Sequence, residues 1–154
     1  MGAAGLRAWR IAGGGHPVFC GEGARRFGGR WNSPGRPAIY CGGSFAICML
    51  ERLVYARIGR LPEGDRWVAV EIPEAEIETF APVEPFAWWG EDVRATRAWG
   101  DRWLEERRSL ALLVPSAVTR LDNNLVINPE HPAFPGLAPS DPQEVVWDPR
   151  LFPG

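Results

Sequence analysis

A single glutamate lies on the apolar side of the clearest helix that the sequence predicts. Apolar residues recur at helical spacing from Ser44 to about Gly59, and Ser44 is a favourable N-cap residue. On a helical wheel the neighbours of Glu51 are Ile47, Cys48, Val54, Tyr55 and Ile58. Burying a carboxylate is costly unless it is paired or used. The pattern therefore leaves two interpretations open: a structural ion pair with an arginine, or a carboxylate that stabilises positive charge in a reaction.

Arg30 is the second candidate, in the segment FGGRWN from Phe27 to Asn32. Two glycines before it let the backbone approach another group closely. A guanidinium can bind a phosphate group through two parallel hydrogen bonds, so Arg30 is a candidate phosphate ligand. The alternative is a surface arginine stacked on Trp31 in a tight turn, and the local sequence alone favours that alternative.

Ser116 is the third candidate, because it directly follows an apolar strand and Pro115. Sites on sheets gather at strand ends, although a serine in this position is most often a turn residue. The chain has no GxSxG motif around Ser116 and no His–Asp pair placed to activate it, so we do not expect a nucleophile. The segment from Gly21 to Phe27 lacks the third glycine of a dinucleotide-binding fingerprint, which argues against a Rossmann site.

Short strands and two helices are predicted to position these residues. The predicted strands are Leu6–Ala12, Ala38–Cys41, Arg66–Ile72, Leu110–Val114, Leu125–Ile127 and Glu144–Trp147. The predicted helices run from Ser44 to about Gly59 and from Asp92 to Ser109, and Gly13–Pro37 is predicted to be a long structured loop. Helices and strands do not alternate regularly. This favours an α+β fold, with a small mixed or antiparallel sheet and packed helices, in a single domain over residues 1–154.

Composition excludes several classes of protein. The formal net charge is −2, and all 17 basic residues are arginine, so the chain lacks the basic surface of a protein that wraps duplex nucleic acid. Three cysteines without a CxxC pair argue against a disulfide framework and a zinc site. No apolar run is long enough for a signal peptide or a membrane span, so we expect a cytoplasmic protein without direct contact to membrane or nucleic acid.

Taken together, these segments resemble the RES domain family, which is named for its arginine, glutamate and serine. The resemblance is carried, in order, by WRIA (9–12), GEGARRFGGRWNSPGRPAIY (21–40), MLERL (49–53), DRWL (101–104), LLVPSAV (112–118) and NNLVINPEHPAF (123–134). It identifies Arg30, Glu51 and Ser116 as the catalytic residues. The segment before Glu51 contains less alanine than the family pattern, but no signature residue is lost.

The resemblance implies an ADP-ribosyltransferase-like fold and the activity of a bacterial toxin. Such toxins degrade NAD⁺, their substrate, by hydrolysis or phosphorolysis of the nicotinamide–ribose bond, and no cofactor is required. The implied partners are inorganic phosphate and a cognate antitoxin with a DNA-binding region, with a homodimer within the complex. Three alternatives stay open: mono-ADP-ribosylation of a protein, a ribonuclease-type toxin, and a non-enzymatic interaction module. The net negative charge argues against a ribonuclease. The presence of all three signature residues argues against a non-enzymatic module.

One carboxylate is enough for this chemistry. Nicotinamide leaves as a neutral molecule from a cation, so no acid is needed to protonate it, whereas a glycosidase usually needs two carboxylates. We expect Glu51 to stabilise the cationic ribose, Arg30 to bind pyrophosphate or the attacking phosphate, and Ser116 to hold the nicotinamide amide or the ribose. The expected substrate-binding residues are Tyr40, which packs on nicotinamide or ribose, Arg10, a second phosphate ligand, Trp31 and Asn32. No metal ligand is expected.

Overall fold

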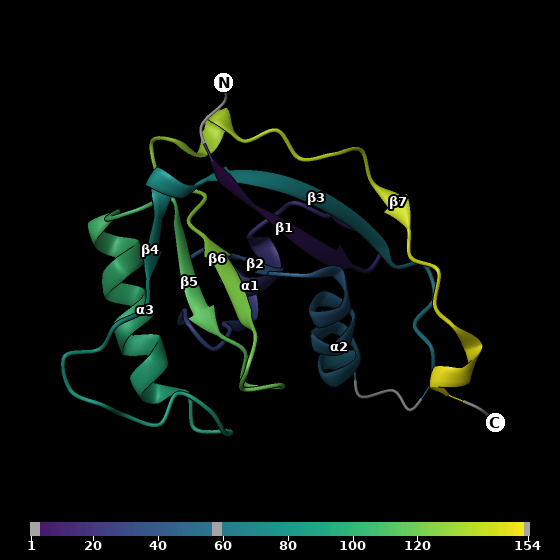
Figure 1. The fold of residues 1–154 in the computed structure, drawn as a ribbon, viewed down its shortest axis with the longest axis horizontal. Helices are drawn as coiled ribbons and strands as arrows, with labels where there is room; N and C mark the ends of the chain where they lie inside the picture. The colour runs from purple at the N-terminus through teal and green to yellow at the C-terminus, as the bar shows by residue number, and fades with distance from the viewer. Residues whose placement is uncertain (1–3, 57–59, 153–154) are drawn as a thin grey trace.

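One seven-stranded sheet organises the computed structural model, which describes residues 4–56 and 60–152 (Figure 1). The strands are β1 (Gly5–Ala12), β2 (Ile39–Gly42), β3 (Arg66–Pro73), β4 (Ile77–Thr79), β5 (Ala111–Pro115), β6 (Asn123–Ile127) and β7 (Gln143–Glu144). The helices are α1 (Glu22–Phe27), α2 (Phe45–Ala56) and α3 (Arg94–Glu106), with 3₁₀ turns at Glu74–Glu76, Phe134–Gly136 and Pro149–Leu151. No helix in these residues is long and apolar enough to cross a membrane.

The sheet is mixed, with the order β4-β5-β6-β2-β1-β3-β7. Strands β4 and β5 run parallel, and every other neighbouring pair is antiparallel. This confirms the α+β fold that the irregular order of helices and strands predicts.

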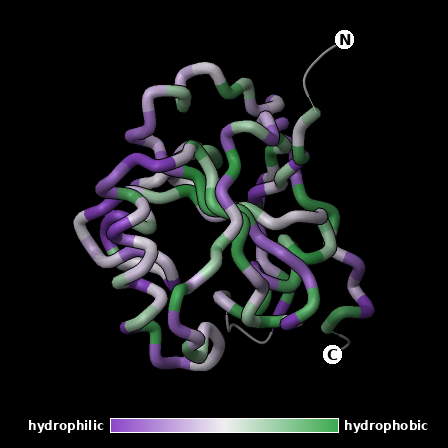
Figure 2. The backbone as a smooth tube through the Cα atoms, turned by 60° about the vertical axis from the view of Figure 1, so that its left-hand side comes forward, coloured by the Kyte–Doolittle hydropathy of each residue, from purple (hydrophilic) through white to green (hydrophobic). Residues whose placement is uncertain are grey.

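The central strands are buried on both faces, which explains their continuous apolar sequence. In β6, Leu125 and Ile127 face one core cluster, and Val126 faces the other. Phe19 and Phe134 cover the first cluster, while Trp103 and Leu104 of α3 belong to the second. Figure 2 shows the hydrophobic residues gathered in the crossing central strands.

The sheet opens between β1 and β2. These two strands share one registered pair, Trp9 with Gly42, whereas β1 pairs with β3 from Gly5 to Ala12. Helices α2 and α3 lie on the same side of the sheet, and the lower ends of β5 and β6 point into the space between them (Figure 1). Side chains from β1, β2, β5 and β6 can therefore meet beside α2.

The structure corrects several predicted boundaries. The predicted loop Gly13–Pro37 contains α1, a six-residue helix that ends at Gly28, whose φ is 74°, and short helices of this kind lack a clear apolar period. Strand β4 was not predicted, and β7 is only two residues long, so the predicted strand Glu144–Trp147 shares only Glu144 with it. Helix α3 ends early because Arg107 is left-handed, with φ 51°. The predicted end of α2, including Ile58 and Gly59, lies outside the described residues.

Candidate active site

A cavity of about 440 Å³ lies where the sheet opens, bounded by α1 and its following loop, α2, and the ends of β1, β5 and β6. Seven polar side chains belong to its lining residues: Arg10, Arg30, Tyr40, Glu51, Arg52, Tyr55 and Asn124. The structure thus brings together five residues that the sequence predicts for the site, Arg10, Arg30, Trp31, Tyr40 and Glu51, and adds Asn124.

Glu51 lies half-buried in the cavity wall, on α2. The helix begins where predicted, since the Ser44 hydroxyl accepts a hydrogen bond from Ile47 N–H at 3.1 Å. The residues beside Glu51 on the helix differ in burial. Cys48 is buried against the sheet, whereas Tyr55 is 67% exposed and also lines the cavity. None of the ion pairs found within residues 4–56 and 60–152 involves Glu51. The structural ion pair considered above is therefore not seen there.

Ser116 lies behind Glu51 and is fully buried. Its Oγ accepts hydrogen bonds from Val118 N–H and Thr119 N–H, both at 3.2 Å, and donates to Oε1 of Glu51 at 3.0 Å. Because the two backbone donors occupy the oxygen's lone pairs, the hydroxyl proton is directed at Glu51. Ser116 does not belong to the cavity lining, so this geometry gives it contact with the carboxylate rather than with a ligand in the cavity.

Asn124, at the start of β6, is the residue that the sequence reasoning missed. Its Nδ2 donates to Oε1 of Glu51 at 2.7 Å. The predicted strand began at Leu125 and so left Asn124 out. The available signal was the period of two: Asn124 lies two residues before buried Val126, hence on the same face of the sheet.

Arg30 is held by a segment far along the chain. Its guanidinium donates to the carbonyl oxygens of Trp88 at 3.0 Å and Gly90 at 2.7 Å. The preceding glycines are both required, as Gly28 has a φ of 74° and a Cβ on Gly29 would lie 2.5 Å from the Tyr40 hydroxyl. A guanidinium has five N–H donors, so these two bonds leave others for a ligand.

Tyr40 joins the cavity wall to the loop that carries Arg30. Its hydroxyl accepts from Trp31 N–H at 2.9 Å and donates to Asn32 Oδ1 at 2.6 Å. Burial raises the pKa of Tyr40 well above its ordinary value. The phenol is therefore a neutral donor and acceptor at any physiological pH.

Trp31 and Asn32 hold this loop in place. Asn32 is fully buried, lies outside the cavity lining, and its amide donates to the carbonyl oxygens of Ala24 and Arg36. Trp31 belongs to the cavity lining, but its side chain is only 2% exposed and packs against Phe80 and Trp99. Within the described residues Arg30 is not among the guanidinium groups that lie over an aromatic ring, so the alternative of a surface arginine stacked on Trp31 is not seen there.

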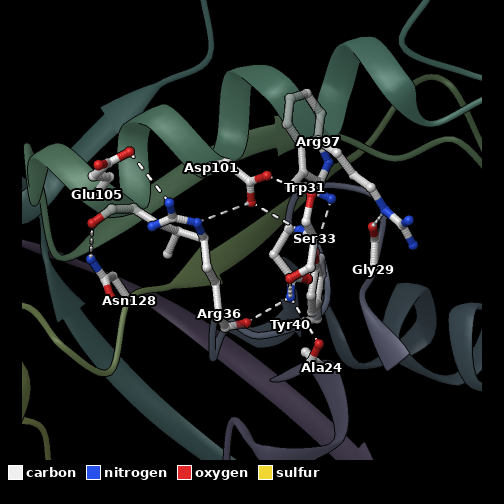
Figure 3. A network of polar contacts seen from close by, with 12 residues as sticks. Ala24, Gly29, Trp31, Ser33, Arg36, Tyr40, Arg97, Asp101, Glu105 and Asn128 are labelled. Atoms are coloured by element: carbon white, nitrogen blue, oxygen red, sulfur yellow. Dashed lines mark hydrogen bonds and ion pairs between the residues drawn. The ribbon is translucent and has the colours of Figure 1, made fainter. Parts of the chain in front are cut away.

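A polar network ties the same loop to α3 (Figure 3). Asp101 accepts hydrogen bonds from the Ser33 N–H at 2.8 Å and the Ser33 hydroxyl at 2.5 Å, and Arg97 Nε donates to the Gly29 carbonyl at 2.8 Å. Helix α3 approaches so closely that a Cβ on Gly100 would lie 1.8 Å from the Trp31 carbonyl oxygen. Helix α3 therefore sets the position of the segment from which Arg30 projects.

Arg10 spans the opening between β1 and β2. Its Nε donates to the Val18 carbonyl at 2.6 Å, and its Nη1 donates to the Tyr40 carbonyl at 3.0 Å. Two thiols also line the cavity, and burial raises the pKa of Cys41 to about 12 and that of Cys48 to about 11. Both are protonated at neutral pH and are poor nucleophiles.

The cavity lining combines one carboxylate, Glu51, with three guanidinium groups, Arg10, Arg30 and Arg52. Arg52 is already paired with Asp65, at 2.9 Å. Such a site suits a ligand with anionic phosphate groups and a centre that becomes cationic. No group of three or more His, Cys, Asp or Glu side chains within the described part of the chain is placed to hold a metal ion.

Comparison with known proteins identifies the family. The chain is 37% identical over 137 residues to Toxin Res of Yersinia enterocolitica, covering 87% of this chain and 90% of that protein. It is 34% identical over 137 residues to the Prs ADP-ribosylating toxin of Sphingobium sp., covering 86% and 85% of the two chains.

A third relative comes from Mycobacterium tuberculosis. Its NAD(+) phosphorylase MbcT is 52% identical over 44 residues, 28% of this chain and 24% of that protein. The crystal structure of the M. tuberculosis MbcT–MbcA toxin–antitoxin complex contains a chain that aligns with a TM-score of 0.76 at 24% identity, covering 97% of this chain and 88% of that one. The model of the RES domain matches residues 7–148, and the chain belongs to the RES domain family.

Proposed function

We propose that this protein is a toxin of a bacterial toxin–antitoxin pair that breaks the nicotinamide–ribose bond of NAD⁺. The proposal rests on the position and the hydrogen bonds of the Glu51 carboxylate. Its carboxylate lies in the cavity wall, held at one oxygen by two donors, in a cavity that Arg10 and Arg30 also line. A fixed negative charge of this kind stabilises a cation that develops beside it.

The bond that breaks joins the ribose C1′ to the nicotinamide nitrogen. Its electron pair goes to the nitrogen, nicotinamide leaves as a neutral molecule, and the ribose becomes oxocarbenium-like. In this proposal Glu51 stabilises that cation. The oxygen of water or of inorganic phosphate then forms the new bond to C1′, and water loses its proton to the solvent. No second carboxylate is needed.

The arginines suit the other half of the substrate. NAD⁺ carries a pyrophosphate, and the guanidinium groups of Arg10 and Arg30 each keep N–H donors that their backbone contacts do not use. In this proposal Arg30 binds pyrophosphate or the attacking phosphate, Arg10 assists it, and Tyr40 packs against nicotinamide or ribose. Ser116 acts through Glu51, because it is fully buried behind that carboxylate.

Two acceptor classes have support among the relatives. MbcT bears the name NAD(+) phosphorylase, which favours phosphate as the acceptor, and the Sphingobium relative bears the name Prs ADP-ribosylating toxin, which favours a protein. The solved MbcT–MbcA complex supports the proposal of an antitoxin partner for this chain.

The first experiment measures nicotinamide release from NAD⁺ by the purified chain, free of antitoxin, with and without inorganic phosphate. Phosphate-dependent release indicates a phosphorylase, and release without phosphate indicates a hydrolase if no protein becomes labelled. Labelled NAD⁺ with cell lysate detects the transferase, which leaves label on a protein band. Absence of both release and labelling would sink the proposal.

The matched variant is Glu51→Gln. The glutamine oxygen can still accept from Ser116 and Asn124, so the site keeps its hydrogen bonds while the negative charge is removed. We expect loss of most turnover, by ~100-fold or more, since removal of one preorganised electrostatic contact costs about that much, with NAD⁺ binding largely retained in calorimetry. Near-full activity in this variant would contradict the role of Glu51.

A further inference from the structure

Two hydrogen-bond donors converge on the same oxygen of Glu51. Ser116 Oγ lies 3.0 Å and Asn124 Nδ2 lies 2.7 Å from Oε1, and Oε2 takes part in neither bond. The donors come from facing strand ends, since Pro115 is in register with Asn123, and Ser116 N–H bonds to the Asp122 carbonyl at 2.8 Å. The frame that holds Oε1 is therefore part of the sheet and not of a free loop.

The amide of Asn124 is oriented by the carboxylate. If the amide were turned over, its Oδ1 would lie against the oxygen of Glu51, and two acceptors would repel each other. In the observed orientation Oδ1 is buried and has no hydrogen-bond partner within residues 4–56 and 60–152. A buried acceptor without a partner lowers stability. Such departures from full pairing are expected where a residue serves function rather than folding, here through its donor.

Fixing Oε1 also fixes Oε2. The last torsion of a glutamate side chain is broad when nothing holds it. Two donors on one oxygen set that torsion, because Ser116, which directly follows β5, and Asn124, which lies in β6, both bond to Oε1. A carboxylate that does not reorient during the reaction stabilises a developing charge more strongly.

We infer that Asn124 is a positioning residue of the reaction, which holds Oε1 of Glu51 together with Ser116 so that Oε2 is presented to the substrate. The inference rests on the proposed function for the reaction that it serves. Three observations support it. Both donors bond to Oε1, Asn124 lines the cavity, and the buried Oδ1 of Asn124 has no hydrogen-bond partner among the described residues.

The test uses two substitutions at position 124 and one at its neighbour. Asn124→Ala removes the donor, and Asn124→Asp keeps the shape but sets a second carboxylate at hydrogen-bond distance from Oε1. Asn123→Ala is the matched control, since Asn123 is the same residue type on the same strand but is exposed and outside the cavity lining. Circular dichroism and thermal unfolding establish the folded fraction of each variant.

For Asn124→Ala we expect kcat to fall ~10- to 100-fold with KM changed little, as for loss of a hydrogen bond to a charged group. For Asn124→Asp we expect the acidic limb of the pH–rate profile to move up by about one pH unit or more, because two adjacent carboxylates share one proton. Asn123→Ala should match the parent. A kcat and a pH profile that stay unchanged in both Asn124 variants would overturn the inference.

A second readout separates this inference from the proposed function. The Glu51 carboxyl carbon can be followed by NMR and assigned by its loss in Glu51→Gln. In Asn124→Asp its titration should move to higher pH even if the protein releases no nicotinamide. Failure of nicotinamide release in the parent sinks the proposed function alone, whereas an unmoved titration sinks the role of Asn124.

Discussion

Nη2 of Arg30 lies 2.7 Å from the carbonyl oxygen of Gly90, sixty residues further along the chain. Together with the Trp88 carbonyl contact, this bond connects the segment between β4 and α3 to Arg30. The same segment has a second contact at Trp89, because the Arg120 guanidinium lies 5.3 Å from the centroid of its ring. The residue that we propose as a phosphate ligand therefore also anchors the segment between β4 and α3.

Arg30→Lys tests this double role. Lysine keeps the charge but cannot bind two carbonyl oxygens in the same fork. We expect faster amide hydrogen exchange in residues 86–90 and a KM for NAD⁺ raised by ~10-fold or more, the effect of losing one charged hydrogen bond. Arg26→Lys is the control, because Arg26 is exposed on α1 and outside the cavity lining. Unchanged exchange and KM in Arg30→Lys would refute both roles.

Ser116→Ala tests whether the serine acts through Glu51. Loss of the hydroxyl leaves Oε1 with the Asn124 donor alone, so we expect kcat to fall ~10- to 100-fold while KM changes little. Thr119→Ala is a matched control: the Thr119 hydroxyl accepts from Leu121 N–H and Asp122 N–H in the same turn and has no contact with Glu51. A selective rise in KM would instead indicate direct contact between Ser116 and the substrate.

Gly100→Ala tests the close approach of α3 to the loop of Arg30. The new Cβ would lie 1.8 Å from the Trp31 carbonyl oxygen, and backbone cannot yield cheaply. We expect the free energy of unfolding to fall by ~3 kcal/mol or more. For a chain of this size that lowers Tm by roughly 6–12 °C in calorimetry. Gly136→Ala should be nearly neutral, as nothing lies within 4 Å of its added Cβ. Equal Tm values for the two variants would contradict this packing.

Alkaline pH should destabilise the protein through its two buried thiols. In the folded state burial raises the pKa of Cys41 to about 12 and of Cys48 to about 11, from an ordinary value of 9.0. Between its unfolded and its folded pKa, each thiol has lost its proton in the unfolded chain but keeps it in the folded chain. The stabilising contribution of the two thiols is therefore complete below pH 9 and declines as pH rises further. Each thiol contributes at most about 1.4 kcal/mol per pH unit.

Urea unfolding between pH 8 and pH 10.5 measures this decline. The double variant Cys41→Ala/Cys48→Ala should have a lower free energy of unfolding at pH 8, but that free energy should decrease less than the parent's as pH rises. Cys20→Ala is the control for removal of a thiol that is only partly buried. If the free energy of unfolding of the double variant decreased with pH as steeply as that of the parent, the two buried thiols would not be the cause of the decline.

Local sequence patterns were enough to predict the elements with a strong signal and the family of the chain. Glu51 could be found because helical spacing placed it on an apolar stripe, and Ser44 marked the start of its helix. Strands β3, β5 and β6 could be predicted because each is a run of β-branched and apolar residues that is stopped by a proline or an asparagine. The order of Arg30, Glu51 and Ser116 within the longer motifs sufficed to predict the family that the comparisons confirm.

Which atoms meet in the site follows from the tertiary structure. The contact of Asn124 with Glu51 joins positions separated by 73 residues, and that of Arg30 with Gly90 joins positions separated by 60. No local pattern encodes such pairs, because they follow from the strand order and from the opening between β1 and β2. Helical spacing indicated where the carboxylate of Glu51 would point, but the register of β5 and β6 determined which donors hold its Oε1.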